Sequence, residues 1–205
     1  IFNVGTLILN NSIVRNNVGT NGSIISSGGG IYNDGGTLTL NSSTISGNVA
    51  VNNSGDGRGG GIFNVNNGTA TINDSTINSN AASYSYGLGG GVYNYFATLI
   101  LNNSTVNNNT ASKTGYGGGG GGIFNDGTAT LNNSTISGNI HSGIYNSNSL
   151  TVNNSTISSN MIGNGVGSDT GGGIGTFGGT VTLKNTIVAR NSASTAPDCS
   201  GSVTS

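Results

Sequence analysis

Hydrophobic and polar residues alternate along this chain in a pattern that returns about every 30 residues. One copy runs from Gly28 to Asn48, with the sequence GGGIYNDGGTLTLNSSTISGN, and seven copies are present. In this copy Leu38 and Leu40 alternate with threonines, which is the period-two pattern of a half-buried strand. A motif repeated at this period indicates stacked structural units, so we expect each copy to form one coil of a solenoid.

Each copy is predicted to hold three short strands. The first contains Ile31, the second contains Leu38 and Leu40, and the third spans 43–46. Gly and Asn between them suit turns, and no stretch has the period of a helix. Because two or three strands alone bury too little apolar surface, each strand must pair with its copy in the next coil. The prediction is an all-β fold, a single-stranded parallel β-helix (β-solenoid) of about seven coils.

Stacked columns of like residues support this arrangement. The four positions held by Ile31, Leu38, Leu40 and Ile45 are Ile, Val, Leu or Ala in every copy. Each buried side chain contributes roughly 1.5–3 kcal/mol, most of which chain entropy offsets. A further inward position carries hydroxyls, which we expect to form a buried ladder. Its members are Ser12, Ser43, Ser75, Ser104, Ser134, Ser155 and Thr186.

An asparagine closes every copy of the repeat. The column consists of Asn17, Asn48, Asn80, Asn109, Asn139, Asn160 and Asn191. Stacked asparagine amides can bond to one another and to the backbone, and we predict such a ladder here. A plainer interpretation is that asparagine tolerates left-handed turn geometry. The two interpretations are compatible.

The motif GG-G-I-Y-N followed by T-L-T-L-N-x-S-T-I-S-G-N resembles the repeats of large bacterial surface and secreted β-helix proteins. These include polymorphic outer membrane protein repeats and the repeat regions behind CSLREA-type N-terminal segments. The resemblance covers nearly the whole chain. It implies a right-handed parallel β-helix of pectate-lyase-like architecture and an extracellular or cell-surface location in bacteria. It leaves function open, because such repeats serve many purposes.

The seven copies are expected to form one β-helix repeat domain over residues 1–191, with one short coil at 140–160. Residues 192–205 form a polar tail or the start of a further segment. The other coils carry loops of about ten extra residues, and we place these at 18–30, 49–58, 81–88 and 110–122. The short coil lacks this loop, so we expect a notch beside His141, with a simple loop deletion as the plainer explanation.

Charge is very low, with five Lys or Arg, six Asp and a net charge of −1. There is no basic stripe for nucleic acid and no apolar run long enough to span a membrane. A neutral surface has little charge repulsion, so self-association, end-to-end or lateral, is expected. Other surface components and polysaccharide are further candidate partners. The chain begins inside a repeat, which suggests a piece of a longer solenoid, and Cys199 is half of a disulfide or a free thiol.

No set of residues for catalysis, metal or cofactor binding is found. Asp34 and Asp126 share a column but lie three coils apart, roughly 14 Å at strand spacing, which is too far for the acid pair of a glycosidase. Asp56, Asp169 and Asp198 fall in loops or the tail, and one Asp per loop supplies too few ligands for calcium. The lone histidine is interpreted as a turn residue.

An aromatic column has the parity of residues that point away from the core. Its members are Phe2, Tyr32, Phe63, Tyr93, Phe124 and Tyr145. An exposed stack of rings would form a sizeable apolar stripe. Three roles are open for it: cover by the Gly-rich loops, contact with another chain during assembly, or stacking on sugar rings.

Threonines form a second outward face. They are Thr37, Thr39, Thr69, Thr71, Thr128, Thr130, Thr180 and Thr182. Such Thr-x-Thr ranks resemble those of ice-binding proteins with a flat β-helix, although threonine is also simply a good exposed strand residue. Ile8 and Ile100 interrupt the ranks.

Taken together, the sequence favours a non-enzymatic extracellular structural repeat segment of a cell-surface adhesin, stalk or self-assembling filament. One alternative is an ice-binding protein that uses the Thr-x-Thr face. The other is a carbohydrate-binding or polysaccharide-degrading β-helix.

Overall fold

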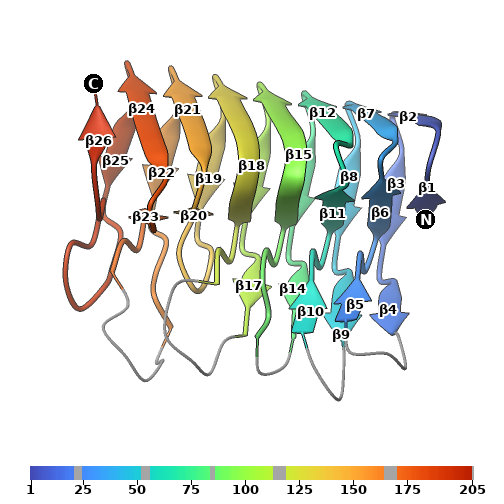
Figure 1. The fold of residues 1–205 in the computed structure, drawn as a ribbon, viewed down its shortest axis with the longest axis horizontal. Coiled ribbons are helices and arrows are strands. Elements are labelled where there is room, and N and C mark those ends of the chain that lie inside the picture. Colours follow the sequence, from blue (N-terminus) through green and yellow to red (C-terminus); the bar gives the residue numbers. More distant parts are fainter. Residues whose placement is uncertain (21–24, 52–55, 84–85, 113–118, 164–169, 205) are drawn as a thin grey trace.

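The computed structural model describes residues 1–20, 25–51, 56–83, 86–112, 119–163 and 170–204. These residues form strands and turns with no helix, and every strand pair is parallel. Figure 1 shows the strands stacked along the longest axis of the molecule, with the N-terminus at one end and the C-terminus at the other. The chain is therefore a parallel β-solenoid, which confirms the predicted all-β stacked architecture.

The largest sheet contains 13 strands and combines two of the three predicted sets. We call the strands at the position of Ile31 the anchor strands, and their first inward-facing residues the anchor column. The anchor strands are β1 (Phe2–Asn3), β6 (Ile31–Asp34), β11 (Ile62–Val65), β15 (Val92–Asn102), β18 (Ile123–Asn132), β20 (Ile144–Asn146) and β23 (Ile174–Thr176). We call the strands at the position of Leu38 and Leu40 the alternating strands, after their alternation of aliphatic and polar residues. They are β2 (Thr6–Asn10), β7 (Thr37–Asn41), β12 (Thr69–Asn73), β21 (Ser149–Asn153), β24 (Thr180–Lys184) and β26 (Val203–Thr204). In β15 and β18 the two sets run together into one bent strand, so separate sheets are not formed there.

The third predicted set forms a seven-stranded sheet behind the first in Figure 1. Its strands are β3 (Ile13–Arg15), β8 (Thr44–Ser46), β13 (Thr76–Asn78), β16 (Thr105–Asn107), β19 (Thr135–Ser137), β22 (Thr156–Ser158) and β25 (Ile187–Ala189). A residue with positive φ precedes each of these strands, such as Asn103 at 50°, and another follows, such as Asn108 at 54°. Asn and Gly favour these left-handed turns, which is why they punctuate the repeat.

Part of the chain assigned to loops is in fact strand. A four-stranded sheet contains β4 (Val18–Thr20), β9 (Val49–Val51), β14 (Ala81–Ala82) and β17 (Thr110–Ala111). A two-stranded sheet pairs β5 (Ile25–Ser27) with β10 (Asp56–Arg58). The prediction of loops at these positions was wrong because stacking supplies backbone partners even to segments too short to show a pattern.

The core lies inside the coils and consists of the four aliphatic columns. Ile31, Leu99 and Ile136 have no exposed surface, and most other members of the columns are equally buried. Only near the ends of the stack are members partly exposed, as at Leu7 and Val188. Alternation along each strand therefore sends the aliphatic residues inward, as predicted.

Residues after the seventh copy also lie on the stack. Ile174 forms a parallel bridge with Cys199, and β24 pairs with β26 in the register Val181↔Val203. The thiol of Cys199 packs against the core cluster, as the anchor residues before it do. Residues 192–204 thus extend the stack rather than leaving it.

Candidate functional site

The closing asparagines form a continuous hydrogen-bonded ladder. In each step the Nδ2 of one asparagine donates to the Oδ1 of the next, from Asn17 to Asn48 at 2.8 Å through to Asn160 and Asn191 at 3.0 Å. The same Oδ1 also accepts the backbone N–H of the preceding member, at 2.9 Å between Asn80 and Asn109. Asparagine is needed because only a short amide offers donor and acceptor at this reach.

Each interior amide of the ladder makes a third contact, with backbone. Asn109 Nδ2 donates to the carbonyl of Ile77 at 3.0 Å, and equivalent bonds recur from Asn48 to Asn191. None of the ladder asparagines has a positive φ, because the left-handed residue of the turn is the one before them. The plainer interpretation of this column, tolerance of left-handed geometry, is therefore wrong for the asparagines themselves.

Asp198 supplies the last acceptor of the ladder. Its Oδ1 accepts both the backbone N–H of Asn191 at 3.1 Å and Asn191 Nδ2 at 3.0 Å. A carboxylate accepts hydrogen bonds and donates none. Each asparagine of the ladder donates to the next one, so the last position needs only an acceptor, and the Asp198 carboxylate supplies it.

The predicted hydroxyl column is a second ladder, running beside the first. The backbone N–H of Ser75 donates to Ser104 Oγ at 3.1 Å, and Ser104 repeats the contact with Ser134 at 3.2 Å. Each hydroxyl also donates to a backbone carbonyl two residues back, as from Ser104 to Asn102 at 2.7 Å. The hydroxyls are buried in the interior of the stack.

A third ladder, also buried, was not predicted from the sequence. It joins Asn3, Asn33, Asn64, Asn94, Asn125 and Asn146, with Nδ2 to Oδ1 distances between 2.6 and 2.9 Å. Asn33 lies two residues after Ile31, so it shares the inward parity of the anchor column. That parity was the available signal.

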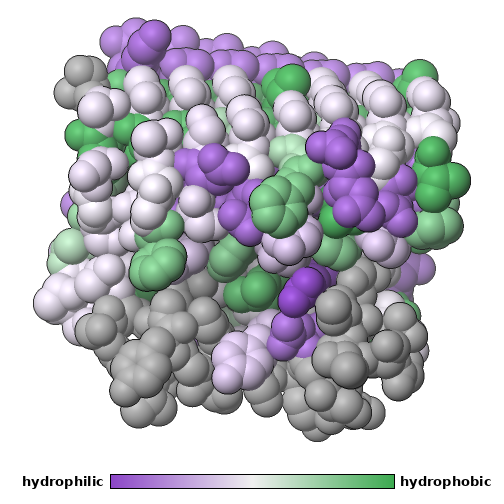
Figure 2. Space-filling view, in the orientation of Figure 1, coloured by the Kyte–Doolittle hydropathy of each residue, from purple (hydrophilic) through white to green (hydrophobic). Residues whose placement is uncertain are grey.

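Half-buried amides form a further row along the edge of the solenoid. Asn41, Asn73, Asn102, Asn132 and Asn153 each donate from Nδ2 to the preceding member, beginning at Asn10. Figure 2 shows this hydrophilic edge where the alternating strands end. Donation here runs toward the N-terminus, opposite to the buried ladders.

The aromatic column is a stack of rings outside the core. Neighbouring ring centroids lie 5.0–5.3 Å apart from Phe2 to Tyr145. Phe63 and Tyr93, at its centre, are only 4% exposed, and Leu88 and Tyr95 pack against them. The guanidinium of Arg58 lies 5.8 Å from the Tyr93 ring centroid. Cover by neighbouring segments therefore accounts for the centre of the column, and an exposed stripe is not formed there.

Burial has an electrostatic effect at this column. It raises the pKa of Tyr93 far above its ordinary value, and the Arg58 cation only partly opposes this rise. The pKa of Tyr32 is raised as well, first by burial and then by the nearby Asp34 carboxylate. Both hydroxyls are thus neutral over the physiological range.

The outward threonines fall into register across the stack. Thr69 is paired with Thr37 and Thr98, and Thr71 with Thr39 and Ile100. The rows continue through Thr128 and Thr130 to Thr180 and Thr182. Thr37, Thr128 and Thr180 are exposed and the other members of the predicted face are half-buried. Ile100 interrupts the second row, as expected from the sequence.

A further threonine row was missed on the neighbouring sheet. It contains Thr44, Thr76, Thr105, Thr135 and Thr156, joined by the pairings of β8, β13, β16, β19 and β22. The same alternation that buries Ile45 and Ile77 sends these threonines outward.

The described carboxylates are dispersed and already bonded. Asp34 accepts from Asn66 at 2.7 Å, Asp126 from Ser147 at 3.0 Å, and Asp56 forms an ion pair with Arg58 at 3.0 Å. Asp34 and Asp126 share a register column three rungs apart. Among the described residues, no group of three His, Cys, Asp or Glu side chains comes together. Asp169 lies outside the described residues.

His141 lies near the start of the short coil. Its backbone N–H donates to Met161 at 2.8 Å, and a Cβ placed on Gly163 would come within 2.8 Å of its Cε1 atom. The imidazole therefore covers Gly163 at the place where a notch was expected. No helix in the described part of the chain is long and apolar enough to cross a membrane.

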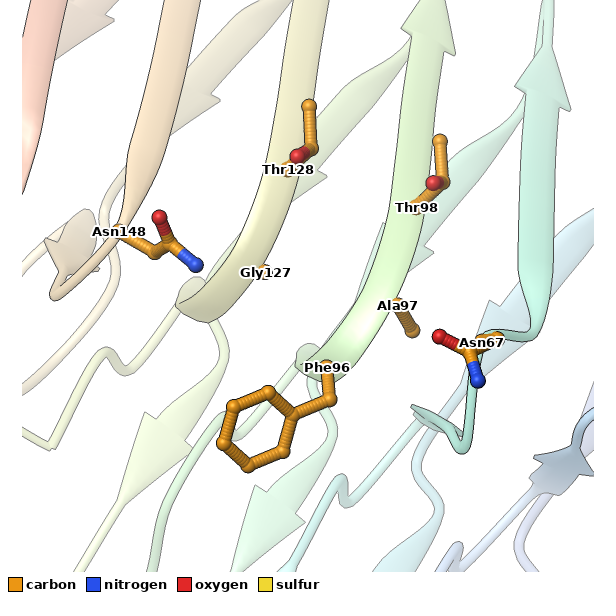
Figure 3. Close-up of a pocket in the computed structure, with 7 residues that line it drawn as sticks. All are labelled: Asn67, Phe96, Ala97, Thr98, Gly127, Thr128 and Asn148. Atoms are coloured by element: carbon orange, nitrogen blue, oxygen red, sulfur yellow. The ribbon is translucent and has the colours of Figure 1, made fainter.

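A shallow depression of about 260 Å³ opens at the corner between the anchor and alternating strands. It is lined by Asn67, Phe96, Ala97, Thr98, Gly127, Thr128 and Asn148 (Figure 3). Phe96 is 59% exposed. The sequence offered one signal that was missed: a phenylalanine at a corner where the second copy has glycine.

Comparison of the chain with protein-family models, with curated proteins and with solved structures gives no match. The fold and the surfaces described above are therefore the basis for any functional argument.

Proposed function

We propose that this chain is a non-enzymatic structural repeat segment of an extracellular or cell-surface bacterial protein, an adhesin, stalk or filament. In this proposal it is organised as seven right-handed coils built on three principal strands each, in the manner of the bacterial surface repeats it resembles. The observation that carries the proposal is the asparagine ladder, which continues from Asn17 to Asp198 without a missing step.

A continuous ladder suits a mechanical role. Every interior coil repeats the same buried amide and hydroxyl contacts, so each coil is held to its neighbours by polar contacts as well as by apolar packing. Such a stack behaves as a quasi-one-dimensional rod whose length is set by the number of repeats. The buried asparagine and serine groups of the ladders are bonded to neighbouring coils. This use of the buried polar groups supports the role of a spacer rather than that of a reaction centre.

Contact between copies is part of this proposal. With a net charge of −1, the surface has little electrostatic repulsion to keep copies apart. Light scattering and negative-stain imaging over a range of concentrations test it. Concentration-dependent lateral or end-to-end particles support self-association, whereas a monomer at every concentration removes this part and leaves the spacer role standing.

The test of the main proposal is an activity screen on neutral and acidic polysaccharides, read by reducing ends and by unsaturated products. A structural segment gives no turnover. Steady cleavage that is lost in Asp34→Asn or Asp126→Asn, with both variants still folded, would overturn the proposal in favour of a polysaccharide-degrading β-helix.

Ice binding is the second candidate, favoured by the register of the outward threonines. Thr69, Thr98 and Thr128 stand in neighbouring rungs of one row, at the regular spacing of parallel strands. Thermal hysteresis at high protein concentration would support it, with loss in Thr71→Tyr or Thr130→Tyr and retention in Thr105→Tyr on the neighbouring sheet. Absence of hysteresis in the unsubstituted protein excludes it.

A further inference from the structure

Phe96 stands out because its backbone and its side chain are both unusual. It has a φ of 46°, and positive φ is unfavourable for a bulky residue. The second copy has Gly35 at the same place in a corner of the same length, with φ of 66°. Phenylalanine thus occupies a backbone conformation that glycine adopts without strain. Its ring is 59% exposed rather than packed in the core.

The ring of Phe96 nevertheless packs against a neighbouring ring. Its centroid lies 4.4 Å from that of Tyr95, with the planes at 61°, and Tyr95 in turn contacts the buried Tyr93 at 5.6 Å. The backbone carbonyl of Phe96 accepts the N–H of Asn67 at 2.8 Å. A side chain that already packs against a neighbour loses less freedom when a ligand binds than one without such a contact.

The floor of the depression beside this ring is open. Two residues, Phe96 and Ala97, oppose the single Gly127 of the next coil, which gives a register shift in the pairing of β15 with β18. A Cβ on Gly127 would collide with the carbonyl oxygen of Ala97, so this position of the lining is restricted to glycine. The corner of the next coil therefore presents backbone rather than a side chain to the depression.

Polar groups surround the ring without being used by the fold. Figure 3 shows the amides of Asn67 and Asn148 on opposite sides of the depression, with the hydroxyls of Thr98 and Thr128 above it. Asn67, Thr128 and Asn148 are exposed and Thr98 is half-buried. Side-chain donors elsewhere bond to the backbone carbonyls of Thr98, Thr128 and Asn148, whereas the four side chains themselves make no hydrogen bond within the described part of the chain. Both donors and acceptors are thus available to a ligand.

We propose that this depression binds one neutral sugar ring of a poly- or oligosaccharide, with its C–H face on Phe96 and its hydroxyls at the two amides and two threonines. A pyranose has an apolar face and a polar rim, and the negative face of an aromatic ring attracts C–H groups. The volume of about 260 Å³ lies below the range of roughly 300–1,000 Å³ for drug-sized ligands, so a single ring fits it better than a longer segment.

The lining selects neutral over acidic sugars. No charged side chain lines the depression, so a uronate carboxylate would find no cation here. The nearest residue in the chain with a charge is Asp126, directly before Gly127, and its sign would repel a carboxylate. With one ring bound from one side, we expect a dissociation constant on the order of millimolar.

The test uses the full chain and four neutral probes: cellotetraose, maltotetraose, mannotetraose and N-acetylchitotetraose, with tetragalacturonate as the acidic comparison. Amide shifts in ¹H–¹⁵N spectra report binding and its place. At least one neutral probe is expected to shift Ala97, Thr98 and Gly127 selectively, while tetragalacturonate leaves them in place.

Variants separate binding from folding. Phe96→Gly is expected to keep its melting temperature within about 5 °C, because glycine accepts the positive φ, and to weaken binding at least about tenfold. Phe177→Gly, at an exposed corner of another coil, is the matched control and is expected to bind normally. Asn148→Ala removes an exposed, unbonded amide and is expected to weaken binding without unfolding the chain.

The proposal is overturned if no neutral probe shifts these amides at concentrations up to about tenfold above the expected dissociation constant. It is equally overturned if Phe96→Gly and Asn148→Ala both bind as the unsubstituted protein does, or if tetragalacturonate shifts the same amides. None of these outcomes bears on the structural role, which is tested by turnover.

Discussion

Asn109 and Asn139 are joined by two hydrogen bonds to a single atom: Asn139 Oδ1 accepts Asn109 Nδ2 at 3.1 Å and the Asn109 backbone N–H at 2.9 Å. Both residues are fully buried. One amide oxygen therefore satisfies a side chain and a turn of the preceding coil. The turn at Asn109 therefore depends on the next coil for its hydrogen bonds, and this dependence joins neighbouring coils along the ladder.

Replacing Asn109 with alanine should destabilise the fold strongly. The change removes the donor to Asn139 and the acceptor used by Asn80, so buried polar groups in two neighbouring coils lose their partners. Each unsatisfied buried group costs about 1–3 kcal/mol. Chemical denaturation is expected to show at least this loss in the free energy of unfolding.

Asn102→Ala is the matched control, because Asn102 belongs to the half-buried outer row of the same coil. Water can replace its amide partners, so a loss below about 1 kcal/mol is expected. Equal losses in the free energy of unfolding for Asn102→Ala and Asn109→Ala would show that burial of the ladder does not increase its contribution to stability.

The buried Tyr93 predicts a loss of stability in alkali. Its pKa is raised in the folded protein, so the unfolded chain releases this proton first as the pH rises. The stabilisation is complete below the ordinary tyrosine pKa of about 10 and falls above it by up to about 1.4 kcal/mol per pH unit. Denaturant titrations between neutral pH and strong alkali measure this slope.

Tyr93→Phe should reduce the alkaline slope, since Phe63 and Phe124 show that a phenyl ring fits this column. The remaining slope is assigned to Tyr32, whose pKa is also raised by burial. An unaltered slope in Tyr93→Phe would contradict the assignment.

Cys199 should react slowly while the chain is folded. Burial raises the pKa of its thiol, and the Asp198 carboxylate raises it further, so less of the reactive thiolate is present. The rate of reaction with a thiol reagent, followed against pH, is expected to rise only above the ordinary range near 8.5. Asp198→Asn should move the profile toward lower pH. A folded rate equal to that in denaturant would refute this prediction.

Much of the fold followed from the repeat. Leu38 and Leu40 alternate with threonine over enough residues to reveal both the strand and its inward face, and stacking then fixes the register. The ladder of Asn109 followed in the same way, because one unbroken polar column inside a turn has few other physical explanations. Asn33 needed only the same parity argument, applied two residues beyond Ile31.

Other features depended on contacts that no short pattern carries. Strand β14 holds only Ala81 and Ala82, and it is a strand because its neighbours present backbone groups at the right height. The burial of Phe63 depends on residues such as Leu88 from the following segment. The depression at Phe96 arises from a register shift against Gly127, which becomes visible only when two coils are placed side by side.

Native-state hydrogen exchange shows whether the asparagine ladder and the strands form one cooperative scaffold. The backbone N–H groups of Asn48, Asn80 and Asn109 donate to side chains of the next coil, whereas that of Leu101 belongs to a strand. We predict that the asparagine amides exchange within about 1 kcal/mol of the global free energy of unfolding, as core strand amides do. Rapid exchange of the asparagine amides beside a fully protected Leu101 would show that the turns open independently, and that the ladder and the strands are not one cooperative unit.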